Sequence, residues 1–468
     1  MSDVVTLPDA VLDTLKQIVG EAKLRLDAES LATFGKDWTK VYEPCPAAIV
    51  FPKTVEQVQA IVRLANAQQL ALVPSGGRTG LSAGAVAAKG EIVVAFDDMN
   101  RIADFDPTDR TVVCQPGVIT EQLQQFAEQQ GLFYPVDFAS SGSSQIGGNI
   151  STNAGGIKVI KYGMTRDWVA GLTVVTGSGE ILELNRGLMK NNAGYDLRQL
   201  FIGAEGTLGF VVEATMRLTR QPINLTVLVL GVPEFSTIMD VFSTFQSAMD
   251  LTAFEFFSEK ALQKVVAHSG LQRPFETPAK FYALLEFENT NDDVEVLAMT
   301  LFERCMEQGW VLDGAMSQSI DQLKNMWRLR EDISETISQW TPYKNDIATM
   351  VSKMPGFLKE VDTIVTKNYP DFEIIWFGHI GDGNVHLNIL KPDELAKEIF
   401  FEQCHRVSKW VFEIVEKYRG SVSAEHGVGL MKKDSLSYSR SQSEIALMKQ
   451  IKQVFDPNGV MNPGKIFD

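Results

Sequence analysis

The chain has 468 residues, of which 45% are hydrophobic and 22% are charged. This length exceeds what one hydrophobic core usually serves, so we expect a globular protein of two or three domains. The formal net charge of −16 argues against general electrostatic binding of nucleic acid or of an anionic membrane surface. No run of about 18 apolar residues is present, so the sequence predicts no membrane span.

The N-terminus has neither the charged-then-apolar pattern of a secretory signal nor the arginine- and serine-rich pattern of a transit peptide. We therefore expect a cytoplasmic protein. The four cysteines, Cys45, Cys114, Cys305 and Cys404, are widely scattered, and no two of them have the C-x-x-C spacing. They are expected to be small buried side chains rather than disulfide partners or metal ligands.

Apolar residues at helical spacing predict a helical arm in the first 41 residues. From residue 42 to residue 221, short apolar runs alternate with helical patterns, which indicates an α/β arrangement. The predicted elements there are a strand at 48–52, a capped helix at 54–69, and strands at 71–73, 91–96 and 111–115. Beyond residue 221 a separate α+β domain is expected, with strands at 225–230 and 281–287 and helices at 234–249 and 291–307.

Three glycine-rich stretches interrupt the first half of the chain, at 74–80, 142–156 and 203–209. None of them has the spacing of a P-loop or of a Rossmann opening, which disfavours nucleoside triphosphates and nicotinamide cofactors. The loop 74–80 can present successive backbone N–H groups to a pyrophosphate, with Arg78 adding charge. A tight structural turn is the alternative for each loop. The three loops together favour a binding site for a dinucleotide. None of them contains a histidine or cysteine that could bind a flavin covalently.

Three of the five histidines lie in two short segments, 378–388 and 424–427. Histidine is the commonest neutral metal ligand and the usual proton shuttle near neutral pH. The pair Asp382-Gly383 is typical of a two-residue type I′ hairpin turn, which would place His379 opposite His386 with Asn388 on the same face. One divalent ion could then contact both rings. A polar hairpin without a metal is the alternative.

Glu425 and His426 form a second candidate pair. Neighbouring residues of an extended chain point in opposite directions, so one side chain could bind a metal while the other faces a substrate. A plain surface loop is the alternative. A carboxylate substrate would also need a local cation in this acidic chain. Arg328 and Arg330 are candidates, since arginine can hold a carboxylate through two hydrogen bonds, although a solvated salt bridge is the alternative for each.

The order of the motifs resembles the FAD domain of the vanillyl-alcohol oxidase and p-cresol methylhydroxylase superfamily. The motifs are PSGGRTG at 74–80, QIGGNISTNAGG at 145–156, GYDL at 194–197 and EGTLG at 205–209. Three later motifs resemble signatures of its D-2-hydroxyacid dehydrogenase branch, namely GHIGDGNVH at 378–386, EHG at 425–427 and NGVMNPGK at 458–465. The resemblance extends from about residue 42 to the end of the chain.

The resemblance implies an α+β fold class with a two-subdomain FAD-binding domain of the p-cresol methylhydroxylase type. The expected domains are a helical arm (1–41), the FAD-binding domain (42–221), a substrate or cap domain with the metal hairpin (222–420), and a C-terminal segment completing both sites (421–468). FAD is expected to bind non-covalently. The residues expected to contact it are Pro74, Ser75, Gly76, Gly77, Arg78, Thr79, Gly80, Pro135, Ser144, Gly148, Ser151, Thr152, Asn153, Ala154, Glu205, Gly206, Val211 and Asn462.

The same resemblance implies that His379, His386 and Glu425 bind a divalent metal, with zinc expected, and that His426 is the general base. The residues expected to bind the substrate are Arg330, Ser334, Lys344 and Asn388. Ser334 departs from the family pattern, where threonine is expected, but the hydroxyl is kept.

The implied activity is that of a flavoprotein dehydrogenase that oxidises D-2-hydroxyglutarate to 2-oxoglutarate. Metal-assisted proton abstraction and hydride transfer to FAD are the expected steps. Electrons would pass to electron-transfer flavoprotein or a quinone, and a homodimer is a further expectation. Two alternatives remain open: a D-lactate or glycolate dehydrogenase of the same family and, from another class, a non-flavin metal hydrolase or metal-binding module.

Overall fold

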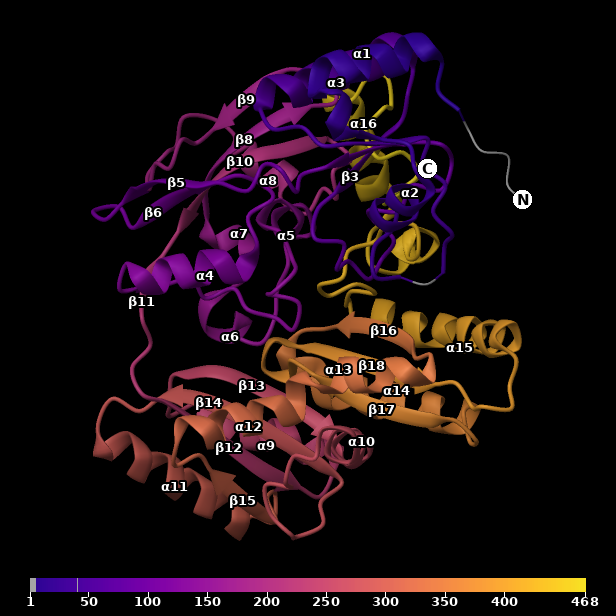
Figure 1. The fold of residues 1–468 in the computed structure, drawn as a ribbon. Coiled ribbons are helices and arrows are strands. Elements are labelled where there is room, and N and C mark those ends of the chain that lie inside the picture. The colour runs from indigo at the N-terminus through magenta and orange to yellow at the C-terminus, as the bar shows by residue number, and fades with distance from the viewer. Residues whose placement is uncertain (1–5, 40) are drawn as a thin grey trace. The chain divides into compact units, whose positions relative to one another are not determined.

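The computed structural model describes residues 6–39 and 41–468, which form two compact units (Figure 1). The first unit consists of residues 6–39, 41–155, 164–221 and 425–468. The second consists of residues 222–424 and the short segment 156–163. Within the described residues, no helix is long and apolar enough to cross a membrane.

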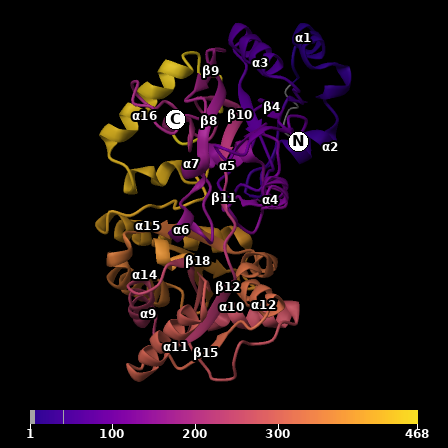
Figure 2. The same cartoon turned by 90° about the vertical axis from the view of Figure 1, so that its left-hand side faces the viewer.

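The first unit contains a small sheet with the strand order β1-β2-β4-β3 within the described residues, in which β2 and β3 run parallel to β4. Helices α1 and α3 lie next to each other (Figure 2) and bury Leu15, Val58 and Val62 in the core of this sheet. The hydroxyl of Thr54 accepts the backbone N–H of Gln57 at 3.3 Å and caps α3, so the helix predicted at 54–69 is confirmed. The elements are α1 (Asp9–Val19), β1 (Leu24–Arg25), α2 (Ala28–Phe34), β2 (Ala48–Val50), α3 (Val55–Gln68), β3 (Leu72–Ser75) and β4 (Ile92–Ala95).

A second sheet of the first unit has the order β5-β6-β10-β8-β9 in the described chain and is antiparallel throughout. Its core contains Leu123 from α4 and Ile150 from α5, and the C-terminal helix α16 joins it through Phe455, whose ring lies 5.0 Å from that of Phe201. The elements are β5 (Ile102–Asp106), β6 (Thr111–Cys114), α4 (Thr120–Gln129), β7 (Leu132–Phe133), α5 (Ile146–Thr152), α7 (Thr165–Trp168), β8 (Val169–Thr176), β9 (Ile181–Leu184), α8 (Arg198–Phe201), β10 (Gly209–Arg217), β11 (Thr219–Arg220) and α16 (Gln442–Phe455).

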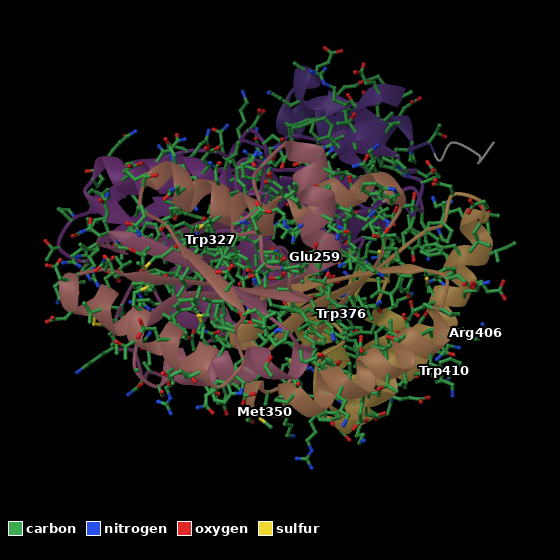
Figure 3. All side chains as sticks on the ribbon, turned by 90° about the horizontal axis from the view of Figure 1, so that it is seen from below. Glu259, Trp327, Met350, Trp376, Arg406 and Trp410 are labelled. Atoms are coloured by element: carbon green, nitrogen blue, oxygen red, sulfur yellow. The ribbon has the colours of Figure 1, made fainter. Side chains whose placement is uncertain are left out.

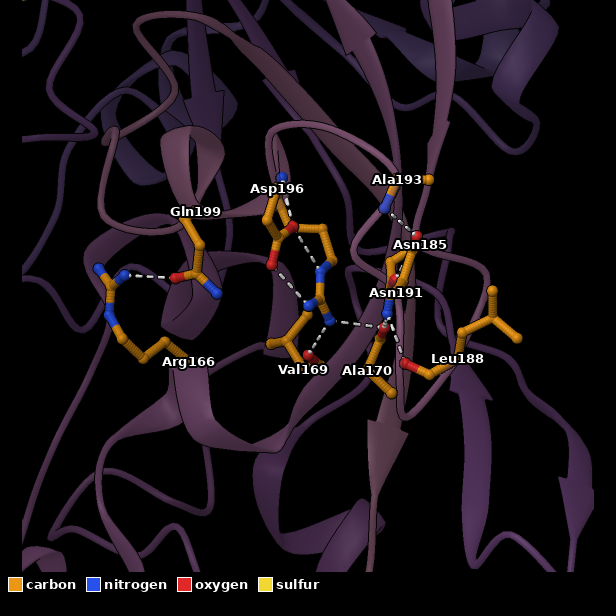
Figure 4. A network of polar contacts seen from close by, with 10 residues as sticks. Arg166, Val169, Ala170, Asn185, Leu188, Asn191, Ala193, Asp196 and Gln199 are labelled. Carbon is orange, nitrogen blue, oxygen red and sulfur yellow. Dashed lines mark hydrogen bonds and ion pairs between the residues drawn. The ribbon is translucent and has the colours of Figure 1, made fainter.

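The loop between β9 and α8 is fixed by a network of polar contacts (Figure 4). The guanidinium of Arg198 donates to the backbone carbonyls of Val169 and Ala170 at 2.8 and 2.6 Å and forms an ion pair with Asp196 at 2.7 Å. Asn185 donates to the carbonyls of Ala170 and Leu188, both at 2.8 Å. The aspartate of the GYDL motif therefore serves to hold this loop against β8.

The second unit is built on an antiparallel seven-stranded sheet with the order β15-β12-β14-β13-β17-β18-β16. The strands and helices expected near 225–230, 234–249, 281–287 and 291–307 are confirmed as β12, α9, β14 and α11. The strands are β12 (Leu225–Val232), β13 (Leu251–Ser258), β14 (Phe281–Glu288), β15 (Asp313–Met316), β16 (Tyr343–Ala348), β17 (Glu373–Gly378) and β18 (Asn384–Leu390). The helices are α6 (Val159–Tyr162), α9 (Ile238–Gln246), α10 (Glu259–Ser269), α11 (Asp292–Glu307), α12 (Ile320–Glu331), α13 (Ile333–Ile337), α14 (Met354–Asn368) and α15 (Lys397–Lys417).

The two faces of this sheet are covered by different elements. Helices α10, α12 and α13 pack on one face, where Trp327 joins the main core cluster. Trp376 of β17 points to the other face and contacts the ring of Phe235 at 5.5 Å (both tryptophans are labelled in Figure 3). Successive residues of a strand therefore point to differently covered faces of the sheet. Asn388 and His386 of β18 lie on the same face as Trp327.

The two-residue turn predicted for the histidine hairpin is wrong. β17 ends at Gly378 and β18 begins at Asn384, and a 3₁₀ turn (Ile380–Asp382) occupies most of the connection. Phe377, rather than His379, is paired with His386. A type I′ turn needs positive φ at both central residues, whereas only Gly383 of the expected pair has it, at 88°. The register is shifted by two residues, which leaves the outward and inward faces of β18 unchanged.

Three of the four cysteines are buried as expected, and Cys45 is half-buried instead. All four are free of disulfide bonds within the described residues. Burial raises the pKa of Cys114 and of Cys404 to about 12, so neither thiol is a reactive thiolate at neutral pH.

Candidate active site

The first glycine loop follows β3 and is folded around Arg78, whose φ is 60°. Its guanidinium donates to the backbone carbonyl of Gly76 at 2.7 Å and pairs with Asp97 at 2.8 Å. The side chain therefore fixes the loop instead of offering an unpaired charge. A Cβ on Gly77 would collide with the carbonyl oxygen of Ser143, so the first two glycine loops are in direct contact.

The second and third glycine loops are joined by backbone hydrogen bonds. The N–H of Gly203 donates to Ile150 at 3.0 Å, and the N–H of Glu205 donates to Ser151 at 2.8 Å. Asn153 ends α5 in the left-handed conformation with φ of 50°. Nothing lies within 4 Å of the position that a Cβ on Gly148 would take, so the backbone of α5 borders open space there. The predicted cofactor residues of the three loops are therefore brought together within one unit.

The tail of the chain returns to these loops at Asn462, which is fully buried. Its backbone N–H donates to Leu72 at 2.7 Å, and its side-chain amide donates to Gly84 at 2.9 Å and to the carbonyl of Glu205 at 2.7 Å. Asn462 Oδ1 and Gln145 Oε1 are buried atoms without a hydrogen-bond partner among the described residues. Orphaned acceptors beside glycine loops are the surroundings that a polar dinucleotide needs, so the residues present fit FAD.

The remaining predicted cofactor residues are placed as follows. Pro135, Ser144 and Val211 are buried, and the hydroxyl of Ser144 is bonded to that of Thr120 at 2.7 Å. Gly206 has a φ of 69°, and a Cβ there would lie 2.6 Å from the ring of Pro74.

The carboxylate of Glu205 holds the loop that follows His426. It accepts the backbone N–H of Val428 at 2.7 Å and that of Gly429 at 2.8 Å. Burial raises the pKa of Glu205, and the two backbone hydrogen bonds act in the opposite direction. A Cβ on Gly427 would lie 3.0 Å from this carboxylate, so the EHG motif needs its glycine for close approach.

Three of the predicted substrate residues meet on one face of the second unit's sheet. Lys344 on β16 is paired with Asn388 on β18, and its ammonium donates to the hydroxyl of Ser334 at 3.1 Å. The amide nitrogen of Asn388 is buried and has no hydrogen-bond partner among the described residues. A buried donor of this kind indicates a site for a polar ligand.

Arg330 is buried, in contrast to Arg328, which is exposed and pairs with Asp332. Its guanidinium lies 4.8 Å from the ring centre of Phe377, and Nη2 lies 2.8 Å from Oε2 of Glu255. Nε of Arg330 has no hydrogen-bond partner among the described residues. Sequence reasoning missed Glu255, although a single carboxylate in the apolar strand LTAFEFFS is a signal that could have found it.

The two histidines of the hairpin lie together, with ring centres 5.3 Å apart and rings at 86°. Nδ1 of His379 is 2.8 Å from Oε1 of Glu255, and Nδ1 of His386 is 3.7 Å from Oδ1 of Asp346. Each histidine therefore turns Nδ1 toward a buried carboxylate. Histidines that bind metals in proteins commonly have such a carboxylate partner on the nitrogen that does not bind the metal.

Glu425 and His426 follow a segment that is attached to β16. Ser423 forms a parallel bridge with Asp346, and the N–H of Ala424 donates to the carbonyl of Asp346 at 3.3 Å. In the second unit the buried side chains of Asp346 and His386 face each other at 3.7 Å. In the first unit Nε2 of His426 lies 4.0 Å from Oε1 of Glu425. Of the predicted metal ligands, His379 and His386 thus belong to the second unit and Glu425 to the first. Their nitrogen and oxygen donors are of the kind that fits a borderline divalent cation such as zinc.

Comparisons with known proteins agree with this geometry. The FAD binding domain family matches residues 46–185, and the family of the C-terminal domain of FAD linked oxidases matches residues 221–466. D-2-hydroxyglutarate dehydrogenase of Stutzerimonas stutzeri (strain A1501) is 68% identical over 458 residues, which cover 98% of this chain and 99% of the relative. D-2-hydroxyglutarate dehydrogenase of Xanthomonas citri pv. viticola is 52% identical over 462 residues, which cover 99% of this chain and 98% of the relative.

Solved structures with the same fold include p-cresol methylhydroxylase with substrate bound, with a TM-score of 0.76 and 15% identity over 98% of this chain and 97% of that chain. The 4-ethylphenol oxidase of Gulosibacter chungangensis gives a TM-score of 0.77 at 15% identity, over the same shares of the two chains. The expected fold class is thus confirmed, and the molecule is an FAD-dependent oxidoreductase.

The chain belongs to the FAD-linked oxidase family, in the group of the D-2-hydroxyglutarate dehydrogenases. The alternative of a non-flavin hydrolase or metal-binding module is therefore wrong, because it required the glycine loops to be purely structural.

Proposed function

We propose that this protein oxidises D-2-hydroxyglutarate to 2-oxoglutarate. The observation that carries the proposal is the pair of cations on one face of the second unit. Arg330 is buried on α12, and Lys344 reaches Ser334 from β16. A dicarboxylate has two anionic groups to bind. A buried arginine for one of them and a half-buried lysine for the other would favour it over a monocarboxylate. The relatives at 68% and 52% identity carry the same substrate in their names.

The side chains of this face would bind and orient the substrate. Arg330 has an unpartnered Nε and would donate to one carboxylate, while Lys344 and Ser334 would bind the other. The buried amide nitrogen of Asn388 would donate to the oxygen at C2 or to the adjacent carboxylate. These contacts would exclude water from the reacting end and fix which face of C2 is presented.

His426 would accept the proton of the C2 hydroxyl. Support comes from Glu425, whose Oε1 lies 4.0 Å from Nε2 of His426, and from the Glu205 carboxylate that fixes the backbone two and three residues later. FAD, when bound, would supply the two-electron acceptor for the C–H bond at C2. The three glycine loops and Asn462 would hold it through backbone N–H groups and the orphaned acceptor atoms.

The predicted ligands of a divalent metal are His379, His386 and Glu425, and zinc is the proposed ion. A bound cation would lower the pKa of the substrate hydroxyl and orient it. The carboxylate 2.8 Å from Nδ1 of His379 supports this assignment, because a hydrogen bond there places the ring's lone pair on Nε2, and Asp346 lies 3.7 Å from Nδ1 of His386. Asp346 is a further candidate ligand, or a partner that orients His386.

The test is reduction of the bound flavin by a set of D-2-hydroxy acids, followed by its absorbance under anaerobic conditions. D-2-Hydroxyglutarate should bleach the flavin, and its kcat/KM should exceed that of D-lactate by about 10- to 100-fold, the worth of one charge-assisted hydrogen bond in a buried site. D-Malate, with a shorter chain, should lie between them. Equal or faster reduction by D-lactate or glycolate would replace the proposal with the alternative dehydrogenase activity.

Removal of the metal tests the second part of the proposal. Exhaustive chelation should lower turnover, and zinc should restore it while FAD stays bound. Unchanged turnover and unchanged substrate affinity after complete metal removal would exclude the metal from the reaction.

We further propose electron-transfer flavoprotein or a quinone as the electron acceptor, a homodimer as the assembly and the cytoplasm as the location. The acceptor is tested by reoxidation kinetics of the reduced flavin with each candidate. The assembly is tested by light scattering on the purified protein. Rapid reoxidation by oxygen alone would exclude the two acceptors in favour of an oxidase.

A further inference from the structure

Glu255 is a buried carboxylate that joins two functional side chains of the second unit. It lies on β13, and only 1% of it is exposed. Its Oε2 is 2.8 Å from Nη2 of Arg330, and its Oε1 is 2.8 Å from Nδ1 of His379. A single side chain thus contacts both a proposed substrate cation and a proposed metal ligand.

The contact with His379 decides which ring nitrogen can bind a metal. A carboxylate accepts a hydrogen bond only from the protonated nitrogen, so Nδ1 of His379 must carry the hydrogen. The lone pair of the neutral ring is then on Nε2. His379 lies just before the 3₁₀ turn Ile380–Asp382 and not within a strand, so the backbone ladder does not fix its ring. Glu255 therefore supplies a hydrogen bond that helps to orient this ring.

The contact with Arg330 fixes the second functional group. An arginine inside a protein needs an anionic partner, because an unpaired buried charge is costly. Glu255 supplies this partner from one side, and the ring of Phe377 lies 4.8 Å from the guanidinium carbon. The unpartnered Nε of Arg330 remains available to a ligand.

We propose that Glu255 is a positioning residue that couples the metal site to the substrate-binding cation. It holds His379 in the tautomer whose lone pair is on Nε2, the nitrogen that would bind the metal, and holds Arg330 in the orientation that receives a substrate carboxylate. Loss of the carboxylate should therefore weaken metal binding and substrate binding together. This inference rests on the proposed function, specifically on His379 as a metal ligand.

Glu286 provides a matched control on the neighbouring strand β14. It is equally buried, at 1% exposed, and lies on the same face of the sheet. Its carboxylate is bonded to Thr252 at 2.6 Å, Trp327 at 2.8 Å and Lys158 at 3.1 Å, and no contact joins it to His379 or Arg330 in the described structure. E286Q thus disturbs a comparable buried network without touching either functional side chain.

The experiment compares wild type, E255Q, E286Q and H379Q as flavin-loaded full-length proteins. A glutamine at 255 has one acceptor and one donor, so it can satisfy His379 or Arg330 but not both. Zinc affinity is measured by competition with a chromophoric chelator, and affinity for 2-oxoglutarate by titration calorimetry. E255Q should raise the zinc Kd by about 10- to 100-fold and also raise the Kd for 2-oxoglutarate, while E286Q changes both less than about twofold.

A second measurement observes the ring of His379 in the wild-type protein and does not need E255Q to fold. The chain has five histidines, so ¹⁵N-histidine labelling of the wild type gives few signals, and loss of a signal in folded H379Q assigns His379. With zinc bound, His379 should be protonated at Nδ1, and the zinc-dependent shift should fall on Nε2. Protonation of Nε2 in that state would overturn the inference, as would wild-type zinc affinity in folded E255Q.

The outcomes separate this inference from the function on which it rests. If wild type binds no zinc, or H379Q binds it as tightly as wild type, the proposed metal site fails. If H379Q loses zinc but E255Q keeps both affinities, the metal site stands and the positioning role of Glu255 is refuted.

Discussion

Replacement of Glu205 by glutamine should slow flavin reduction without removing FAD. The wild-type carboxylate accepts two backbone N–H groups, from Val428 at 2.7 Å and from Gly429 at 2.8 Å. A glutamine keeps one acceptor oxygen and places an NH₂ group against the other N–H, so one buried donor loses its partner. Such a loss costs about 1–3 kcal/mol. Because about 1.4 kcal/mol corresponds to a factor of ten, the ordered form of the loop should fall by roughly 10- to 100-fold relative to a loosened form.

The assay is the rate of flavin bleaching by D-2-hydroxyglutarate in a stopped-flow instrument, for protein with confirmed FAD content. The backbone N–H of Glu205, which bonds to Ser151, is unaffected by the change. E91Q is the control, because Glu91 is also buried and accepts the backbone N–H of Lys89 at 2.6 Å in another loop. E205Q should be slower by about 10-fold or more, and E91Q should keep the wild-type rate. A wild-type rate in E205Q, or a rate that falls only with lost FAD, would refute the positioning of the His426 loop by this carboxylate.

Three further predictions follow from the site and from its surroundings. H426A should lower turnover by about 100-fold or more with FAD and metal retained, measured by steady-state kinetics, and near-normal turnover would remove His426 as the base. G77A should lose FAD, seen as a lower ratio of flavin to protein absorbance, because its Cβ would collide with the Ser143 carbonyl; full FAD content would show that this contact can relax. Burial lowers the pKa of Lys465 to about 8, whereas its value in the unfolded chain is 10.5. Between these two pH values the unfolded chain binds more protons at this group than the folded protein does. The free energy of unfolding therefore increases as pH rises through this range. K465M should therefore exceed wild type in unfolding free energy near pH 7 by up to about 3 kcal/mol, and the difference measured by urea unfolding should shrink toward pH 10; a constant difference would contradict the charge argument.

Local patterns are sufficient for the capped helix and for the strands with long apolar runs. The helix capped by Thr54 and the strands near residues 225 and 281 lie where their periodicity predicts them. The histidine hairpin was placed on the right face but in the wrong register. Its connection is a 3₁₀ turn stabilised by tertiary contacts, and a Cβ on Gly383 would collide with the carbonyl oxygen of Thr349, a residue far away in sequence. Turn preference alone could not include that contact.

Short motifs are enough to identify the class of this protein, because glycine loops and histidine motifs depend on short-range geometry that a few adjacent residues encode. Which side chains act on one another depends on how the whole chain folds. Glu255 meets Arg330 and His379 only because β13, α12 and the hairpin converge on one side of a sheet. Glu205 meets the loop after His426 across more than 200 residues of chain. Such contacts depend on strand order and register, which long-range packing sets and which no local pattern contains.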